Sequence, residues 1–185
     1  MLTKLRRRKS LTMLKLHNIE QGTAEWHELR NGKITGSSVK TLLTKNKSEA
    51  YNKPSTFKGN YHTERGHALE EPAIGLYQDI NNIDVLRTGF VTNSKYPECG
   101  YSPDGVLGNK LIEVKCFAEE RHKYASGTIP FEILAQIHFG MMICELAETD
   151  LIFYNPDLAV KDCLIIRNVK RDKRIEDNIK LKLGG

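Results

Sequence analysis

Residues 102–116 read Ser-Pro-Asp-Gly-Val-Leu-Gly-Asn-Lys-Leu-Ile-Glu-Val-Lys-Cys, and this stretch decides the predicted fold. Gly108 and Asn109 are a two-residue turn signal between two short runs of β-forming residues, which predicts a hairpin. With these two residues as the loop, Leu107 pairs with Lys110, and the pairing continues outward along both strands. We therefore expect the rest of the chain to pack around an antiparallel pair of strands.

The same register brings acidic side chains together. Asp104 falls opposite Glu113, with Cβ atoms roughly 5 Å apart, and Lys115 shares the face of Glu113 because side chains alternate along a strand. Two carboxylates this close repel each other unless a cation lies between them. A hard divalent ion such as Mg²⁺, which binds carboxylate, water and phosphate oxygens, would remove that repulsion. The hairpin therefore predicts a metal-dependent nuclease site.

A purely structural hairpin is the alternative interpretation. Asp before Gly is ordinary turn chemistry, and an exposed Glu-x-Lys on a strand is often only a solvated face. The paired register, Pro103 before the aspartate and the apolar residues that alternate with Glu113 favour the site over the plain turn.

Composition indicates one globular domain with a basic start. The 185 residues are enough for a substantial core. The net charge is +5, but six of the 28 lysines and arginines lie in residues 1–15, which contain no acid. We expect residues 1–12 to form a basic, flexible arm that contacts nucleic acid, acts as a nuclear address or is a disordered leader. Residues 13–185 should form a single nuclease domain.

Several classes of protein are excluded by what the sequence lacks. No apolar run reaches the length of a membrane span, and the N-terminus has no apolar signal core. The four cysteines are scattered without a Cys-x-x-Cys pair, which predicts buried, reduced thiols in a cytosolic protein. The six histidines show no zinc spacing.

Capping signals and periodicity predict an alternation of helices and strands. The expected elements are an extended lead-in over 16–23, a helix capped by Thr23, a second helix through Val39, Leu42 and Leu43, a polar loop over 44–60, a helix over 64–80, a strand over 84–92, the hairpin, a helix from Pro130 to about 147, strands over 150–154 and 158–167, and a charged helix over 171–182. This order predicts a mixed α/β core in which helices cover a small sheet.

Two further features have open interpretations. The amides of Gly36, Ser37 and Ser38 before the second helix could bind an anion together with Arg30, or could form a capping box without a ligand. Gln136, on the long helix, is by its spacing alone a structural or exposed residue.

With these residues placed, the chain resembles the YqaJ-type viral recombinase family of the PD-(D/E)xK nuclease superfamily, to which phage lambda exonuclease belongs. Four blocks occur in the family's order. They are residues 26–37 (Trp-His-Glu-Leu-Arg-Asn-Gly-Lys-Ile-Thr-Gly-Ser), residues 66–70 (Gly-His-Ala-Leu-Glu), the hairpin with its Ser-Pro-Asp and Glu-Val-Lys, and Gln136-Ile137-His138 with Met141. The resemblance implies an α/β fold with a restriction-endonuclease-like core, a small mixed β-sheet flanked by helices.

The resemblance also implies catalytic roles at individual positions. One or two Mg²⁺ or Mn²⁺ ions would be bound by Asp104, Glu113 and the main-chain carbonyl of Val114, with Glu70 orienting a water or helping to bind a second ion. Glu71 follows directly and is the alternative to Glu70. Lys115 would position and deprotonate the attacking water, or stabilise the pentacovalent phosphate. Gln136 would support the site by contacting Lys115 or the water.

A pocket for a 5′-terminal phosphate is implied at Arg30, Ser37 and Ser102. The expected activity is a metal-dependent exonuclease that degrades double-stranded DNA 5′ to 3′, leaving 3′ single-stranded tails for viral or phage recombination by strand annealing. The resemblance implies duplex DNA, a single-strand annealing protein and a homo-oligomer, a trimer, as partners. The expected location is the host cytoplasm, or the nucleus of a eukaryotic host. The alternatives are a structure-specific endonuclease on the same core and a non-catalytic DNA-binding module.

Overall fold

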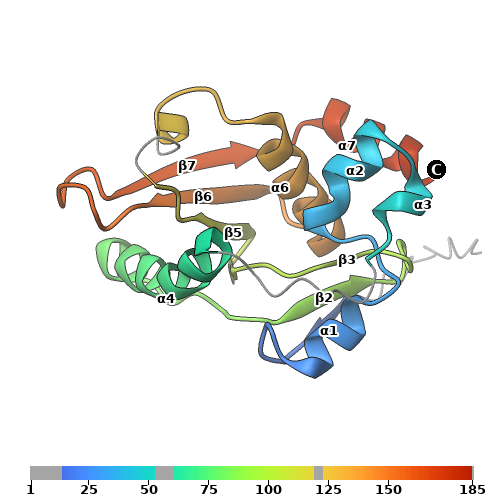
Figure 1. Ribbon diagram of the computed structural model, residues 1–185, viewed down its shortest axis with the longest axis horizontal. Helices are drawn as coiled ribbons and strands as arrows, with labels where there is room; N and C mark the ends of the chain where they lie inside the picture. Colours follow the sequence, from blue (N-terminus) through green and yellow to red (C-terminus); the bar gives the residue numbers. More distant parts are fainter. Residues whose placement is uncertain (1–13, 53–60, 119–122, 185) are drawn as a thin grey trace, which may run out of the picture.

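The computed structural model describes residues 14–52, 61–118 and 123–184, so the predicted basic arm over 1–12 lies outside these ranges (Figure 1). The helices are α1 (Ala24–Arg30), α2 (Val39–Thr44), α3 (Lys47–Ala50), α4 (Tyr61–Asn81), α6 (Phe131–Cys144) and α7 (Lys173–Leu183), with 3-10 turns η1 (Gly36–Ser38) and η2 (Lys123–Ala125). The strands are β1 (Leu14–His17), β2 (Phe90–Asn93), β3 (Gly100–Tyr101), β4 (Gly105–Leu107), β5 (Lys110–Lys115), β6 (Glu148–Tyr154) and β7 (Leu164–Lys170).

The predicted hairpin is confirmed as the β4–β5 pair, in the predicted register over Gly105–Leu107; the ladder ends before Asp104, so the predicted pair Asp104–Glu113 is not part of it. Leu107 pairs with Lys110, and Gly105 pairs with Ile112. Gly108 has a φ of 55°, a left-handed conformation that glycine adopts without steric cost. The hairpin is one edge of a four-stranded mixed sheet with the order β4-β5-β6-β7, in which only β5 and β6 run parallel.

The structure has two small sheets where a single small sheet was expected. The second is antiparallel, with the order β1-β2-β3. The strand predicted over 84–92 is regular only at Phe90–Asn93, because this segment changes sheet. Leu86 bridges Val106 of the hairpin, whereas β2 pairs with β1 a few residues later.

The helices predicted from capping and periodicity are confirmed, with small shifts at their ends. Thr23 caps α1 as expected, and its side chain accepts a hydrogen bond from the Trp26 amide. The loop predicted over 44–60 instead contains the short helix α3, capped by Asn46; the remainder, residues 53–60, lies outside the described residues. The strand predicted over 158–167 begins only at β7, because the preceding turn is longer than expected and Asn155 closes it by a bond to Cys163.

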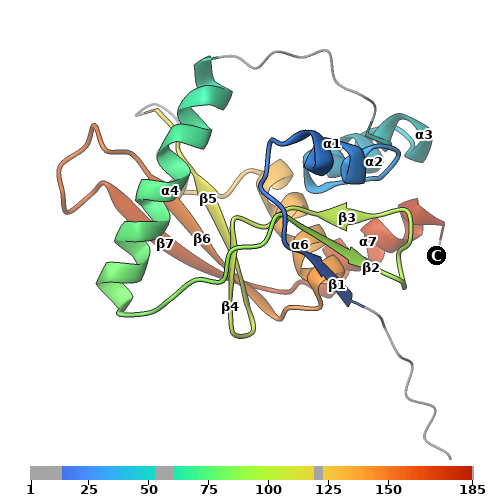
Figure 2. The ribbon, with the colours of Figure 1, turned by 90° about the horizontal axis from the view of Figure 1, so that it is seen from below.

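Helix α6 lies between the two sheets (Figure 2), and ten of its fourteen residues are buried. It packs on the β5 face that carries Leu111 and Glu113, while α4 covers the opposite face through Ile112 and Val114. Alternation along β5 therefore presents Glu113 and Lys115 toward α6, whereas Lys110 shares the face of Ile112 and Val114. The predicted layering of helices on a sheet is confirmed.

Two expectations from composition have an outcome in the structure. All four cysteines are free, as predicted; Cys99, Cys144 and Cys163 are buried as expected, whereas Cys116 is only partly buried. Among the described residues, no helix combines the length and the apolar character that crossing a membrane requires.

Candidate active site

Glu113 is the centre of the candidate site. It is buried in the middle of β5, yet three side chains donate hydrogen bonds to its carboxylate. Oε1 accepts bonds from Lys115 Nζ (2.7 Å) and Gln136 Nε2 (2.6 Å), and Oε2 accepts one from the Tyr101 hydroxyl (2.8 Å). The donors come from β5, α6 and β3, so three elements fix the orientation of one carboxylate.

Asp104 lies beside Glu113, just before β4. Its Oδ2 accepts a 2.6 Å hydrogen bond from the Val114 amide across the hairpin. Burial raises the pKa of Asp104 well above its ordinary value, and the negative charges of Glu113 and Glu70 raise it further. Lys115 and the Val114 amide act in the opposite direction but do not compensate. The cluster is therefore short of positive charge.

Glu70 reaches the same site from α4. It lines a pocket of about 250 Å³ together with Gly66, His67, Asp104, Glu113, Val114, Lys115, Cys116 and Gln136. Its side chain is 21% exposed, whereas that of Glu71 is 76% exposed and does not line this pocket. Burial and Glu113 raise the pKa of Glu70, although its 2.7 Å ion pair with Arg87 lowers it.

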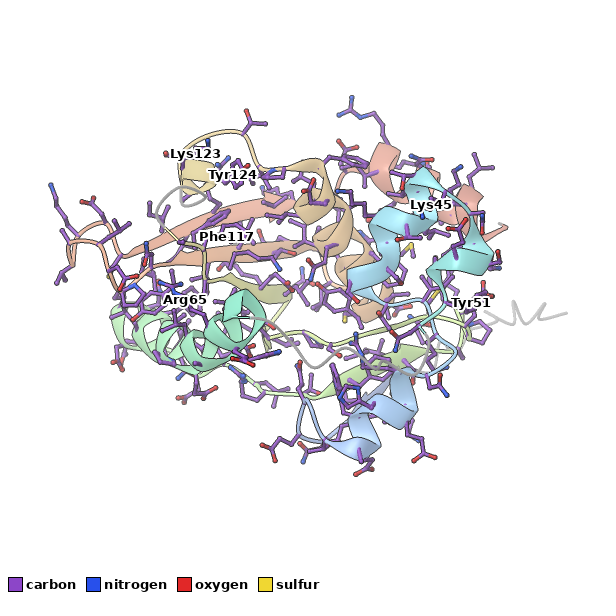
Figure 3. All side chains as sticks on the ribbon, viewed as in Figure 1. Lys45, Tyr51, Arg65, Phe117, Lys123 and Tyr124 are labelled. Atoms are coloured by element: carbon purple, nitrogen blue, oxygen red, sulfur yellow. The ribbon has the colours of Figure 1, made fainter. Side chains whose placement is uncertain are left out.

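The position of α4 against β5 is set at the helix's N-terminal end. Arg65, labelled in Figure 3, donates from Nη1 to the carbonyl oxygen of Cys116 at 3.1 Å. Its Nη2 donates to Asn155 and Asp157 after β6. These bonds hold the N-terminal part of α4 near the ends of the parallel strands β5 and β6. Glu70 follows Arg65 by five residues, so it is held near the same strand ends.

Lys115 and Gln136 complete the cluster. Lys115 Nζ donates to Gln136 Oε1 at 3.1 Å as well as to Glu113. Burial lowers the pKa of Lys115, but the Glu113 and Asp104 carboxylates outweigh it, so the net shift is upward and the ammonium form is favoured. The expectation from spacing alone that Gln136 is a structural or exposed residue is wrong. It faces the site because α6 packs on the face of β5 that carries Glu113 and Lys115.

The residues of the pocket fit a hard divalent ion by their chemistry. Three carboxylates line it, and the pKa of Asp104 and Glu70 is raised by burial and by neighbouring negative charge, a condition that a divalent cation relieves. Among the described residues, however, no group of three or more His, Cys, Asp or Glu side chains is already arranged to hold a metal. The Glu70 carboxylate forms an ion pair with Arg87 instead. The Glu113 carboxylate accepts hydrogen bonds from Lys115, Gln136 and Tyr101.

A cationic cluster of Arg30, Ser37 and Ser102 lies close in sequence to the carboxylates, because Ser102 is two residues before Asp104. Arg30 Nη1 donates to Ser102 Oγ at 2.9 Å, and Nη2 is within 3.5 Å of Ser37 Oγ. Among the described residues no carboxylate lies within ion-pair distance of Arg30, and burial lowers its pKa to about 10. A guanidinium surrounded by hydroxyls and without a counterion is suited to bind an anion. The capping box that was the alternative is also present, formed by Thr35 and Ser38.

Sequence reasoning missed two residues that contact the candidate site residues, Trp26 and Tyr101. Trp26 lies under Arg30, with 4.0 Å from the guanidinium carbon to the ring centroid, and its Nε1 donates to Ser102 Oγ at 3.0 Å. The i, i+4 spacing of Trp26 and Arg30 on one helix face was the available signal. Tyr101, which precedes the Ser-Pro-Asp triplet, gave no signal because its partner Glu113 is 12 residues away.

The comparisons with known proteins agree with this geometry. The family model of the YqaJ-like viral recombinase domain matches residues 25–147, which include the carboxylate pocket and the cationic cluster. A search of curated proteins finds no match.

Two solved exonuclease structures resemble the chain closely in fold. An alkaline exonuclease from Laribacter hongkongensis, LHK-Exo, is 25% identical, with a TM-score of 0.77 over 88% of this chain and 89% of that chain. The same enzyme in complex with dAMP is 24% identical, with a TM-score of 0.76 over 87% and 89%.

A phage-related exonuclease from Haemophilus somnus 129PT is more distant. It is 16% identical, with a TM-score of 0.62 over 85% of this chain and 93% of that chain. At this identity the likeness establishes only a shared fold.

Proposed function

This chain belongs to the YqaJ-like viral recombinase domain family, and on that premise we propose that it is an exonuclease that degrades duplex DNA 5′ to 3′ with divalent metal ions. The relatives of known structure are exonucleases by description, and one binds dAMP, a deoxynucleoside monophosphate of the kind that an exonuclease releases. The proposal places phosphodiester hydrolysis in the carboxylate pocket and end recognition at the cationic cluster.

In the carboxylate pocket, Asp104, Glu113, the Val114 carbonyl and Glu70 would hold one or two Mg²⁺ or Mn²⁺ ions. Such an ion lowers the pKa of a bound water and polarises the scissile phosphate. Lys115 is favoured in its ammonium form, which supports stabilisation of the negative phosphate in the transition state over abstraction of a proton. Gln136 keeps the Lys115 ammonium beside Glu113 through its two hydrogen bonds.

One observation supports the proposed direction of cleavage: Ser102 of the cationic cluster and Asp104 of the carboxylate pocket lie in one three-residue segment. Ser102 accepts a hydrogen bond from Arg30, and Asp104 lies beside Glu113 only two residues later. Two residues of chain span at most about 7 Å, which is comparable to the separation of neighbouring phosphates in a DNA strand. A 5′-terminal phosphate on Arg30, Ser37 and Ser102 would therefore place the next phosphate at the carboxylates, and hydrolysis would release a mononucleotide.

Beside this segment, a hollow of about 450 Å³ shares His67 and Glu70 with the carboxylate pocket. Family membership further supports action on duplex DNA in the host cytoplasm, as part of recombination with a strand-annealing protein, and assembly as a trimer.

The test is a duplex with different labels in its 5′-terminal and 3′-terminal nucleotides, bearing either a 5′-phosphate or a 5′-hydroxyl. With Mg²⁺ we expect the 5′ label to be released first, faster from the phosphorylated end, while covalently closed circular DNA and reactions with chelator stay intact. Arg30→Ala should reduce the preference for 5′-phosphate about 10- to 100-fold, the range for a charged hydrogen bond.

Lys33→Ala is a charge-matched control. Lys33 is three residues from Arg30, but its ammonium donates to the Pro97 carbonyl and not to the hydroxyls of the cationic cluster. Its loss should leave the ratio of the two rates unchanged. Equal rates on the two ends by the unaltered protein would refute the phosphate pocket, and cleavage of the closed circle would favour an endonuclease.

A further inference from the structure

Tyr101 has a buried hydroxyl directed at the centre of the candidate site. The residue ends β3 and is 1% exposed. Its hydroxyl donates to Glu113 Oε2 at 2.8 Å. It does not line the pocket, so any effect on the reaction has to pass through Glu113.

The ring of Tyr101 is confined by two glycines. A Cβ added to Gly36 would lie 2.6 Å from its Cε2, and a Cβ added to Gly140 would lie 2.5 Å from its Cζ. No real side chain tolerates either contact, so the ring occupies space that is available only because both positions lack a Cβ. Phe139 contacts the ring in a tilted arrangement, with the centroids 6.4 Å apart. The hydroxyl is therefore held in one place by η1 and α6.

Within the described part of the chain, the hydrogen bonds of Glu113 leave a single acceptor site free. An ionised carboxylate offers about four lone-pair sites. Oε1 already accepts two bonds, from Lys115 and Gln136, and Oε2 accepts one from Tyr101. The remaining lone pair belongs to Oε2, on the atom that the tyrosine holds in position.

We propose that Tyr101 is a positioning residue that makes Glu113 a one-oxygen ligand of the divalent ion, through Oε2. This inference rests on the proposed function, because it assigns Glu113 to a metal. Partners of ligating carboxylates typically change metal affinity about 10- to 100-fold when they are removed. The alternative is that Tyr101 only satisfies a buried carboxylate and stabilises the fold.

The chain contains a matched control for that alternative. Tyr77 also has a buried hydroxyl that donates to a buried carboxylate, Asp150 Oδ2, at 2.7 Å. Among the described hydrogen bonds of Tyr77, none is to a residue that is proposed to hold a metal. Tyr77→Phe and Tyr101→Phe each remove a buried hydroxyl that donates to a buried carboxylate, one away from the site and one within it.

The experiment measures Mn²⁺ binding by calorimetry without DNA, the melting temperature, and cleavage over a range of Mn²⁺ concentrations. We expect both variants to melt somewhat lower. Only Tyr101→Phe should bind Mn²⁺ about tenfold or more weakly, with slow cleavage at limiting Mn²⁺ that recovers at saturating Mn²⁺. Tyr77→Phe should stay within about twofold of the unaltered protein in affinity.

Infrared difference spectra of the unaltered protein with and without Mg²⁺ give a second readout that needs no folded variant of Tyr101. The bands of Glu113, identified by their loss in Glu113→Gln, should show the wider splitting of a carboxylate bound through one oxygen.

The inference would be overturned by a narrowed splitting of the Glu113 carboxylate bands, or by an unchanged Mn²⁺ affinity in Tyr101→Phe, in a protein that still cleaves DNA when unaltered. Absence of metal-dependent cleavage by the unaltered protein would instead refute the proposed function.

Discussion

Two buried carboxylate clusters lie against the same strand, β5, and they are in opposite electrostatic states. At its start, Asp150 accepts hydrogen bonds from the Tyr77 hydroxyl, Asn168 Nδ2 and Lys110 Nζ, at 2.7, 2.7 and 3.0 Å. Burial raises the pKa of Asp150, but these three donors outweigh it, and the net shift is downward. This cluster contains one acid and one cation, and its charges are balanced.

Toward the end of β5, the pKa of Asp104 moves the other way. Burial and two neighbouring carboxylates, Glu113 and Glu70, raise it, and the opposing groups are Lys115 and one backbone amide. The comparison teaches that a buried acid is not by itself a sign of function. An acid whose charge the protein leaves uncompensated is such a sign, because the missing charge has to come from a ligand.

The largest expected effect separates the two clusters directly. Asp104→Asn should lower metal-dependent cleavage by about 10³-fold or more, since a ligand of the metal is worth several kcal/mol in the transition state. The same variant should melt no lower than the unaltered protein in the absence of metal, because it removes repulsion and keeps an acceptor for the Val114 amide. Steady-state cleavage and thermal unfolding measure the two quantities.

Asp150→Asn is the reciprocal change. It should cost about 1–3 kcal/mol of unfolding free energy, because Lys110 loses its partner, and it should leave cleavage per folded molecule unchanged. If Asp150→Asn abolished cleavage while Asp104→Asn retained it, the assignment of the two clusters would be reversed.

A smaller effect distinguishes the two adjacent glutamates of α4. Glu70→Gln should reduce cleavage about 10- to 100-fold at limiting metal, because it removes one of the three carboxylates from the pocket. Glu71→Gln should change it by less than about twofold, since a side chain this exposed contributes little. Titration of Mg²⁺ against initial rate gives both values, and equal losses in the two variants would place both glutamates at the metal.

The smallest effect is the dependence of stability on pH. A carboxyl with a raised pKa binds its proton more tightly in the native state, so Asp104 makes the metal-free protein lose stability as the pH rises above the pKa of the unfolded chain, about 4. Asp150 does the reverse: it contributes stability above that pH and loses it as the pH falls through its lowered native pKa.

Melting temperatures between about pH 5 and pH 8 should therefore fall more steeply in the metal-free protein than in Asp104→Asn. Saturating Mg²⁺ should remove the difference, because the bound ion supplies the missing charge. Parallel curves for the two proteins without metal would contradict the raised pKa of Asp104.

The sequence predicted what is local and missed what is distant. The register of the hairpin followed from Gly108 and Asn109, because a two-residue turn leaves only one pairing. Gln136 was misjudged from its spacing, since its environment depends on how α6 packs against β5. The Asp150 cluster was not foreseen, because Tyr77 is 73 residues from its partner. An acid in the middle of the apolar strand β6 was the signal that could have indicated it.

Gly140, one of the two glycines that leave space for the Tyr101 ring, has a consequence for engineering. Replacing helical glycines with alanine is a common route to more stable enzymes, with a gain of about 1 kcal/mol per site. Alanine is not tolerated at Gly140, because the added Cβ would clash with the Tyr101 ring. At Gly75 on α4 an added Cβ meets nothing within 4 Å, so alanine is tolerated there. A thermostable variant of this protein therefore has to keep Gly140 and can replace Gly75 with alanine.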